Sequence, residues 1–363
     1  MTEVGYAINV IVVQWMFMNE LLGGGKAACY YLLSIALFSL WGQRVKGGVY
    51  ATRRLYVTFV FPLYWASLLC LPFLNRPLLA VVGIEVLLTF KVGVCMSVCM
   101  HRYAAHAAFK CSWATSLFVQ LVGCLANQGG ALWWAANHRC HHKYCDADDH
   151  EKDPHSPQLD GAANAFAFLA DHKELKEAWV PAYLDSPASR ILDTWASVVV
   201  AAEYLIAYQL GGIDALFMSF ASGWICQTGS LWFNVVNHTS RPGEKPAYNP
   251  RGQATTAVCY AVDASKAVGS SDHLEMPNIF FAAIDALMWQ PVFIGESTHG
   301  HHHAYANLAH RPGIDVPYHI FVRPLWALGL VWSVKTEGRE LLQPREVNEP
   351  KYTRKPTISA KAA

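Results

Sequence analysis

Histidine is the residue type in this sequence that most clearly indicates chemistry, because its side chains are grouped. Nine of the 16 histidines fall in four short motifs. The motifs are HxxxxH (His101, His106), HxxHH (His138, His141, His142), NxxxH (Asn234, His238) and a second HxxHH (His299, His302, His303). Imidazole nitrogen binds Fe, Zn, Cu and Ni, so the grouping predicts a metal site.

The spacing within each motif says which side chains can meet. Residues three and four positions apart share one face of a helix, so the histidines of each HxxHH motif can point at one spot. Asn234 and His238 likewise lie one turn apart on one face. His101 and His106 are five apart, so we expect them to converge only where a helix ends or bends. Nine imidazoles and one amide are too many for one ion but enough for two.

The size of the set favours a particular metal chemistry. A catalytic zinc site uses about three protein ligands and keeps one position open. A larger, histidine-dominated set suits a redox pair of metal ions better, and iron is the usual metal for O2 chemistry on hydrocarbons. A non-enzymatic membrane protein, such as a metal transporter, is the alternative from another class. Transporters place polar ligands near the bilayer midplane, which does not fit motifs at the ends of apolar stretches.

Composition indicates what kind of scaffold must position these side chains. Of the 363 residues, 53% are hydrophobic and only 15% are charged, which points to a membrane protein. The net charge of +1 gives no indication of nucleic-acid binding. The 10 cysteines form no CxxC pair and no regular framework, so we expect reduced thiols.

Four apolar stretches have the length of about 20 residues that a transmembrane helix needs. They form two pairs, each joined by a short turn: Leu55–Asn75 with Leu78–Met100, and Arg190–Leu210 with Ile213–Asn237. We therefore predict an all-α integral membrane fold with two main hairpins. Two shorter stretches, Tyr6–Leu22 and Ala27–Trp41, fit either a third hairpin or one that lies partly in the interface.

Basic residues set the predicted orientation. They cluster just before the Leu55 stretch, as Arg44, Lys46, Arg53 and Arg54. The positive-inside rule then places the N-terminus, the middle segment and the C-terminal third in the cytosol, together with all four histidine motifs. We divide the chain into an N-terminal hydrophobic hairpin with a basic linker (1–54), the main membrane domain (55–336) and a polar tail (337–363).

In their order and placement, these motifs resemble the membrane fatty acyl desaturase family, whose best-known members are the stearoyl-CoA desaturases. The resemblance covers Leu55 to Lys335 and implies a stem of four spans under a cytosolic helical cap that holds two iron ions. It implies that all nine motif histidines are ligands and that Asn234 holds an iron through water. Gly295-Glu296 matches the family's lead-in to the last motif, which leaves His301 outside the ligand set.

The resemblance extends to the expected substrate tunnel. Trp134 matches a tryptophan beside the kink in the acyl chain, and Gln128 and Ser230 match a glutamine and a threonine that close this kink. Ordinary packing is the alternative for Trp134 and Ser230. Two features depart from the family: the first motif continues as Ala107-Ala108, and the polar segment Glu244–Pro277 lengthens the stretch before the last motif. Both departures concern the headgroup of the substrate rather than the metal site.

The resemblance implies O2-dependent oxidation of a fatty acyl chain, with Δ9-type desaturation favoured. Oxidative decarboxylation of a free fatty acid to a terminal alkene, hydroxylation and acetylenic bond formation are the alternatives within the same superfamily. The substrate would be an acyl-CoA, an acyl lipid or a free fatty acid. The sequence carries no haem, flavin or ferredoxin motif, so we expect a separate electron donor of the cytochrome b5 or ferredoxin type. The membrane would be the bacterial inner membrane or the endoplasmic reticulum.

Overall fold

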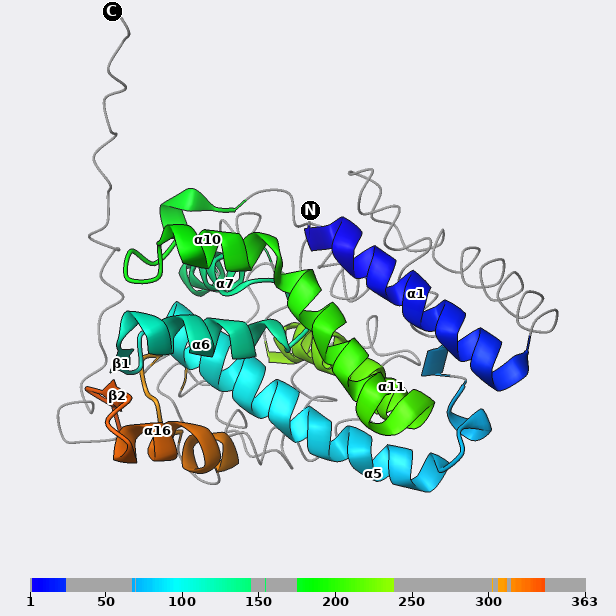
Figure 1. The fold of residues 1–363 in the computed structure, drawn as a ribbon. Coiled ribbons are helices and arrows are strands. Elements are labelled where there is room, and N and C mark those ends of the chain that lie inside the picture. The colour runs from blue at the N-terminus through cyan, green and yellow to red at the C-terminus, as the bar shows by residue number, and fades with distance from the viewer. Residues whose placement is uncertain are drawn as a thin grey trace, which may run out of the picture.

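The structure, a computed structural model, describes residues 2–23, 67–68, 70–144, 154, 175–237, 302, 306–311 and 315–336. Within these ranges it is almost entirely helical (Figure 1). The helices are α1 (Thr2–Leu22), η2 (Leu71–Phe73), α5 (Pro77–Leu88), η3 (Thr89–Ala105), α6 (Trp113–Cys124), α7 (Ala131–Tyr144), η6 (Glu177–Trp179), α10 (Pro187–Thr194), α11 (Ala196–Asn237), η9 (Tyr318–Val322) and α16 (Arg323–Ala327). The predicted stretch Ala27–Trp41, most of Leu55–Asn75, the segment Glu244–Pro277 and the tail 337–363 lie outside the described residues.

The helices α5 and η3 run on without a break and lead to the first histidine motif. Pro77 lies in the first turn of α5, where its missing N–H leaves no hydrogen bond unmade. From Thr89 to Ala105 the hydrogen bonding is of the π type, in which each N–H pairs with the carbonyl five residues back. The predicted span Leu78–Met100 lies inside this helix, which continues to Ala105 and so carries His101 in its last turn.

Two helical segments among the described residues are long and apolar enough to cross a membrane, Pro77–Ala105 and Ala196–Gln227. The outer face of α5 exposes aliphatic side chains, including Leu78, Val82 and Val86. Exposed apolar surface of this extent suits contact with lipid rather than water.

The second of these segments belongs to α11, which folds back on itself at a pair of glycines, so the segment consists of two arms rather than one straight helix. Gly211 and Gly212 leave the helical conformation, and Gly212 has a φ of 61°, which favours glycine. The rings of Tyr204 and Phe220 are 5.7 Å apart between centroids, whereas a straight helix would separate residues 16 apart by about 24 Å. The two arms of α11 are therefore antiparallel, and the turn lies where the sequence predicts it.

The N-terminal helix α1 packs beside the first arm of α11 (Figure 1). Its buried apolar side chains lie on one helix face: Tyr6, Val10, Val13, Phe17 and Met18. The opposite face exposes Ile8, Ile11 and Trp15. Because both faces are apolar, α1 combines a face packed on protein with a face suited to lipid.

The buried side chains form two apolar clusters. One joins α1, α5 and α11, and the other joins η3, α6, α7 and the C-terminal segment, which comprises residues 306–311 and 315–336. A two-residue antiparallel pair, β1 (Lys110–Cys111) with β2 (Val331–Trp332), connects that segment to the chain just after the first histidine motif. The second cluster thus carries the first two histidine motifs and anchors the C-terminal segment beside them.

Candidate metal centre

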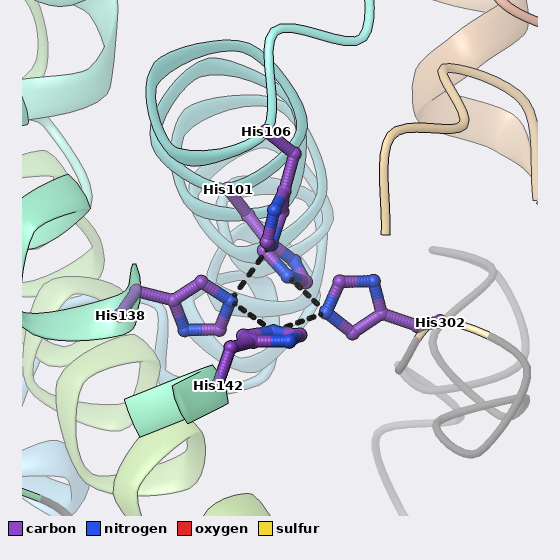
Figure 2. A group of neighbouring side chains, drawn as sticks. All are labelled: His101, His106, His138, His142 and His302. Carbon is purple, nitrogen blue, oxygen red and sulfur yellow. Dashed lines mark hydrogen bonds between the residues drawn. The ribbon is translucent and has the colours of Figure 1, made fainter. Parts of the chain in front are cut away.

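Five histidine side chains converge on one point, with all candidate ligand atoms within 4.8 Å of one another. The five-histidine cluster comprises His101, His106, His138, His142 and His302 (Figure 2). The π-helix η3 supplies His101 and ends at His106, while α7 supplies His138 and His142, one turn apart. Figure 2 shows the rings pointing toward one another, with His302 entering from the opposite side.

The contacts between these rings cannot all be hydrogen bonds. The Nε2 atoms form a chain of contacts from His106 to His138 (3.1 Å), His142 (2.9 Å), His302 (2.9 Å) and His101 (2.8 Å). A neutral imidazole nitrogen carries either one proton or one lone pair. At most two of the four contacts can therefore be full hydrogen bonds, because each nitrogen can take part in only one.

A cation between the five lone pairs removes this conflict. For metal–imidazole bonds of about 2.0–2.1 Å, two ligands at right angles have nitrogens about 2.9 Å apart. The observed Nε2 separations of 2.8–3.1 Å match that value. The donor set therefore fits a transition metal ion that prefers imidazole.

The surroundings keep these imidazoles in the form that binds metal ions. Burial lowers the pKa of His138 well below the ordinary imidazole value, and the neighbouring imidazoles lower it further. The pKa of His302 is lowered too, mainly by burial. The positive charge of Arg311 has the next largest effect, and the neighbouring histidines lower this pKa further. Both side chains are therefore neutral near pH 7, which leaves a nitrogen lone pair free for coordination.

The other predicted ligands are placed less completely. The side chain of His141 is buried beside the cluster, with its ring centroid 5.8 Å from that of His138 and 5.9 Å from that of His142. Its nitrogens are not among the five that converge. Asn234 belongs to the last turn of α11, and the structure describes its backbone alone. The predicted ligands His238, His299 and His303 lie outside the described residues.

The first motif reaches the cluster by a route that its spacing did not indicate. We expected His101 and His106 to meet only where a helix ends or bends. His106 is indeed the residue that ends η3. In addition, the π-type hydrogen bonds of η3 join each N–H to the carbonyl five residues earlier, which brings residues five positions apart closer to one face of the helix. Their ring centroids are 5.1 Å apart.

Comparison with known proteins shows which proteins this chain resembles. No family model matches the chain. The chain is 29% identical to the Hex-5-enoyl-[acyl-carrier protein] acetylenase of Moorena producens (strain JHB), over 69% of this chain and 76% of that protein. It is 26% identical to Delta-9 acyl-lipid desaturase 1 of Arabidopsis thaliana, over 78% and 84% respectively. A probable chloroplastic lipid desaturase of the same plant is 27% identical over 68% of this chain, which spans 62% of that protein.

Over most of its length the chain is similar to fatty acid desaturases and to an acetylenase, which supports the predicted membrane desaturase family. The predicted family and the predicted enzyme class, an oxidoreductase, are thereby confirmed. The relatives also support the coarser functional prediction, oxidation of a fatty acyl chain.

The three side chains predicted for the substrate tunnel form one hydrogen-bonded chain next to the five-histidine cluster. Trp134 Nε1 donates to Gln128 Oε1 at 2.9 Å, and Gln128 Nε2 donates to Ser230 Oγ at 2.8 Å. The Trp134 ring stacks on His138 with centroids 4.6 Å apart. A substrate held against Trp134 would therefore be separated from His138 only by the Trp134 ring.

Asp193 is a functional residue that the sequence did not indicate. Its Oδ1 accepts hydrogen bonds from the backbone N–H groups of Leu132 (2.9 Å) and Trp133 (3.0 Å), at the start of α7. An anion there satisfies free N–H groups and complements the positive end of the helix. A Cβ at position 130 would overlap Asp193, so Gly130 allows this close approach. Asp193 thus fixes the helix that carries the second histidine motif.

Two further contacts fix the first motif. The Tyr183 hydroxyl is 2.7 Å from the carbonyl oxygen of Tyr103 and 2.6 Å from that of Ala104, both between the two histidines of the motif. Arg102, next to His101, forms a fully buried ion pair with Asp315 at 2.6 Å. Nothing local in the sequence pairs these residues, because each contact joins segments far apart in the chain.

Proposed function

We propose that the protein uses O2 and two iron ions to insert a double bond into a saturated fatty acyl chain, as a Δ9-type desaturase. The observation that carries this proposal is the convergence of five imidazoles within 4.8 Å, next to the Trp134–Gln128–Ser230 chain. The remaining predicted ligands complete the set for two ions: His141, His238, His299, His303 and, through water, Asn234.

The chemistry balances with an external electron source. One CH2–CH2 unit, O2, two electrons and two protons give one CH=CH unit and two waters. Bound iron would supply the oxidant that removes hydrogen from an unactivated methylene. The chain's own part is to hold one C–C bond at the centre and to keep water away from it. Trp134, Gln128 and Ser230 would bend the acyl chain, a role supported by the hydrogen bonds that join these three side chains beside the five-histidine cluster.

The proposal includes the surroundings of the site. The substrate is an acyl-CoA, an acyl lipid or a free fatty acid, and a separate cytochrome b5 or ferredoxin supplies the electrons. The domain 55–336 would form four spans with a cytosolic cap, after an N-terminal hydrophobic hairpin (1–54) and before a polar tail (337–363). Support comes from the apolar helix Pro77–Ala105 and from the two apolar arms of the α11 hairpin.

A second candidate reaction is acetylenic bond formation, because one relative of this chain is an acetylenase. The acetylenase reaction removes two more hydrogens from the same two carbons. It needs the same cluster and the same electron supply, but an olefinic rather than a saturated substrate. The position of the oxidised carbons and the order of the new bond distinguish the two.

The test is expression in a microbial host, with gas chromatography of lipids and headspace and iron analysis of the purified protein. We expect an internal olefin of unchanged carbon number and about two irons per chain. Both should be lost in His302→Ala and in His141→Ala but kept in His319→Ala, which changes an exposed histidine of the C-terminal segment. An alkene one carbon shorter would show decarboxylation instead, and bound zinc without O2 consumption would refute the proposal.

A further inference from the structure

The loop between α6 and α7, residues 125–130, is held in a fixed conformation by several elements. Two of its residues have left-handed backbone conformations, Asn127 (φ 58°) and Gly129 (φ 88°). From one arm of α11, the Tyr204 hydroxyl accepts a hydrogen bond from Asn127 Nδ2 at 2.7 Å. From the other arm, Gln227 Nε2 donates to the Asn127 carbonyl at 2.9 Å. Conformations that are rare for non-glycine residues persist where surrounding contacts over-determine them.

The loop matters because its central residue orients the wall of the acyl site. Gln128 accepts from Trp134 with its amide oxygen and donates to Ser230 with its amide nitrogen, so the amide can point only one way. Gln128 Nε2 also approaches the carbonyl of Cys226 at 3.3 Å. A shift of the backbone at Gln128 or Gly129 would therefore move Trp134 relative to His138, on which it stacks.

The N-terminal helix α1 reaches this loop directly. The hydroxyl of Tyr6 accepts a hydrogen bond from the backbone N–H of Gly129 at 3.2 Å, and Tyr6 is only 4% exposed. Next to it, Asn9 Nδ2 donates to the carbonyl of Ser197 at 2.9 Å, and Gly5 packs against the Ser197 side chain. The end of α1 that carries these contacts lies beside the start of α11 (Figure 1).

We infer that α1 is part of the reaction site and that Tyr6 is a positioning residue for the acyl chain. Its hydroxyl holds Gly129, which sets the backbone of Gln128, which in turn aligns Trp134 beside the cluster. A misalignment of about 1 Å can cost about 100-fold in rate, so a contact one residue from the site wall is enough to matter. The inference rests on the proposed function only where it concerns the product.

The test compares Tyr6→Phe with Tyr208→Phe in the full-length, iron-loaded protein. Tyr208 is a matched control because its hydroxyl also links α1 with α11, donating to Glu20 at 3.1 Å, but at the other end of α1. Hydrogen exchange by mass spectrometry reports the loop in peptides covering residues 125–135. Product analysis reports the position of the new double bond, and iron analysis reports the centre.

For Tyr6→Phe we expect hydrogen exchange in the loop to become about tenfold faster, because the Gly129 N–H loses its acceptor. Turnover should fall about tenfold at similar KM, and the double bond should spread over neighbouring positions, while iron content stays at the wild-type level. Tyr208→Phe should change none of these. A merely structural role for Tyr6 would lower stability and iron content without moving the double bond.

Exchange in the loop that is unchanged, or equal in the two variants, would overturn the inference. If Tyr6→Phe lost the product while exchange in the loop stayed unchanged, the inference would also fail, because Tyr6 would then affect activity by a route other than the loop. If wild-type protein oxidises no acyl chain, the proposed function fails, and the exchange measurement alone decides whether Tyr6 positions the loop.

Discussion

Asp193 offers the sharpest test of how this chain holds its metal ligands. Its carboxylate accepts the backbone N–H groups of Leu132 and Trp133 at the start of α7. Changing Asp193→Ala leaves both donors without this acceptor, whereas Asp193→Asn keeps an acceptor oxygen and removes only the charge. The pair of variants therefore separates hydrogen bonding from electrostatics at one site.

The magnitude follows from the two contacts. An orphaned buried N–H costs about 1–3 kcal/mol, so Asp193→Ala should lose about 2–6 kcal/mol of stability. Loss of a group that orients metal ligands typically costs about 10–100-fold in metal affinity. We expect a chelator to remove iron from the alanine variant faster by a factor in that range, because His138 and His142 both stand on α7.

The charge itself predicts a pH dependence. Burial raises the pKa of Asp193 from 3.8 to about 6, against the opposing effects of its two N–H donors and Arg190. The unfolded chain loses the proton near the lower pKa and the folded chain near the higher one. Stability contributed by Asp193 should therefore fall as the pH rises from about 4 to about 6, by about 3 kcal/mol, and be constant above. In Asp193→Asn that slope should disappear.

The rate at which a chelator removes iron measures the effect on metal binding. The apparent thermal midpoint, recorded at one scan rate, measures the effect on stability and its pH dependence. Asp214→Asn is the control, because Asp214 also accepts a backbone N–H, that of Asn75, but at the exposed far end of the hairpin. Wild-type iron retention in Asp193→Ala would refute the role assigned to the two hydrogen bonds. A pH slope that survives in Asp193→Asn would refute the assignment of the titration to Asp193.

Three further outcomes are expected. Asp315→Asn should lose about 3–5 kcal/mol, seen as a lower thermal midpoint, because it leaves Arg102 buried without its counter-charge; the double variant with Arg102→Met should recover part of the loss. Tyr183→Phe should weaken iron retention with only a small fall in thermal midpoint, because it removes one hydroxyl from the carbonyls of Tyr103 and Ala104; a normal iron content would contradict this. Chelation of the wild-type protein should lower the midpoint, and both Fe2+ and Zn2+ should restore it, while acyl oxidation returns with Fe2+ alone.

Local spacing in the sequence predicted several features of the fold and of the site. The i to i+4 spacing of His138 and His142 predicted their common face, and the Gly211-Gly212 pair marked the turn of α11. Apolar length located the helix through Leu78–Met100. In each case the signal lies within a few residues, because helix periodicity and glycine conformation are local properties.

The supporting contacts could not be predicted in this way. Asp193 acts on Leu132, 61 positions away, and Tyr6 acts on Gly129, 123 positions away. Such pairs arise only when the tertiary fold brings distant segments together, and an aspartate or tyrosine carries no local mark of its partner. The π-type hydrogen bonding of η3 was likewise not foreseen, because an apolar stretch has the same composition whichever hydrogen-bond register its backbone adopts.

The ion pair next to the first motif has a consequence for the timing of assembly. Arg102 and Asp315 are 213 positions apart, so at about 5–20 residues per second the ribosome adds Asp315 about 10–40 s after Arg102. Throughout that interval the helix that carries His101 and Arg102 has been synthesised, while Asp315, which pairs with Arg102, has not. The first histidine motif therefore reaches its final setting only when most of the chain has been synthesised, and the five-histidine cluster is incomplete until then.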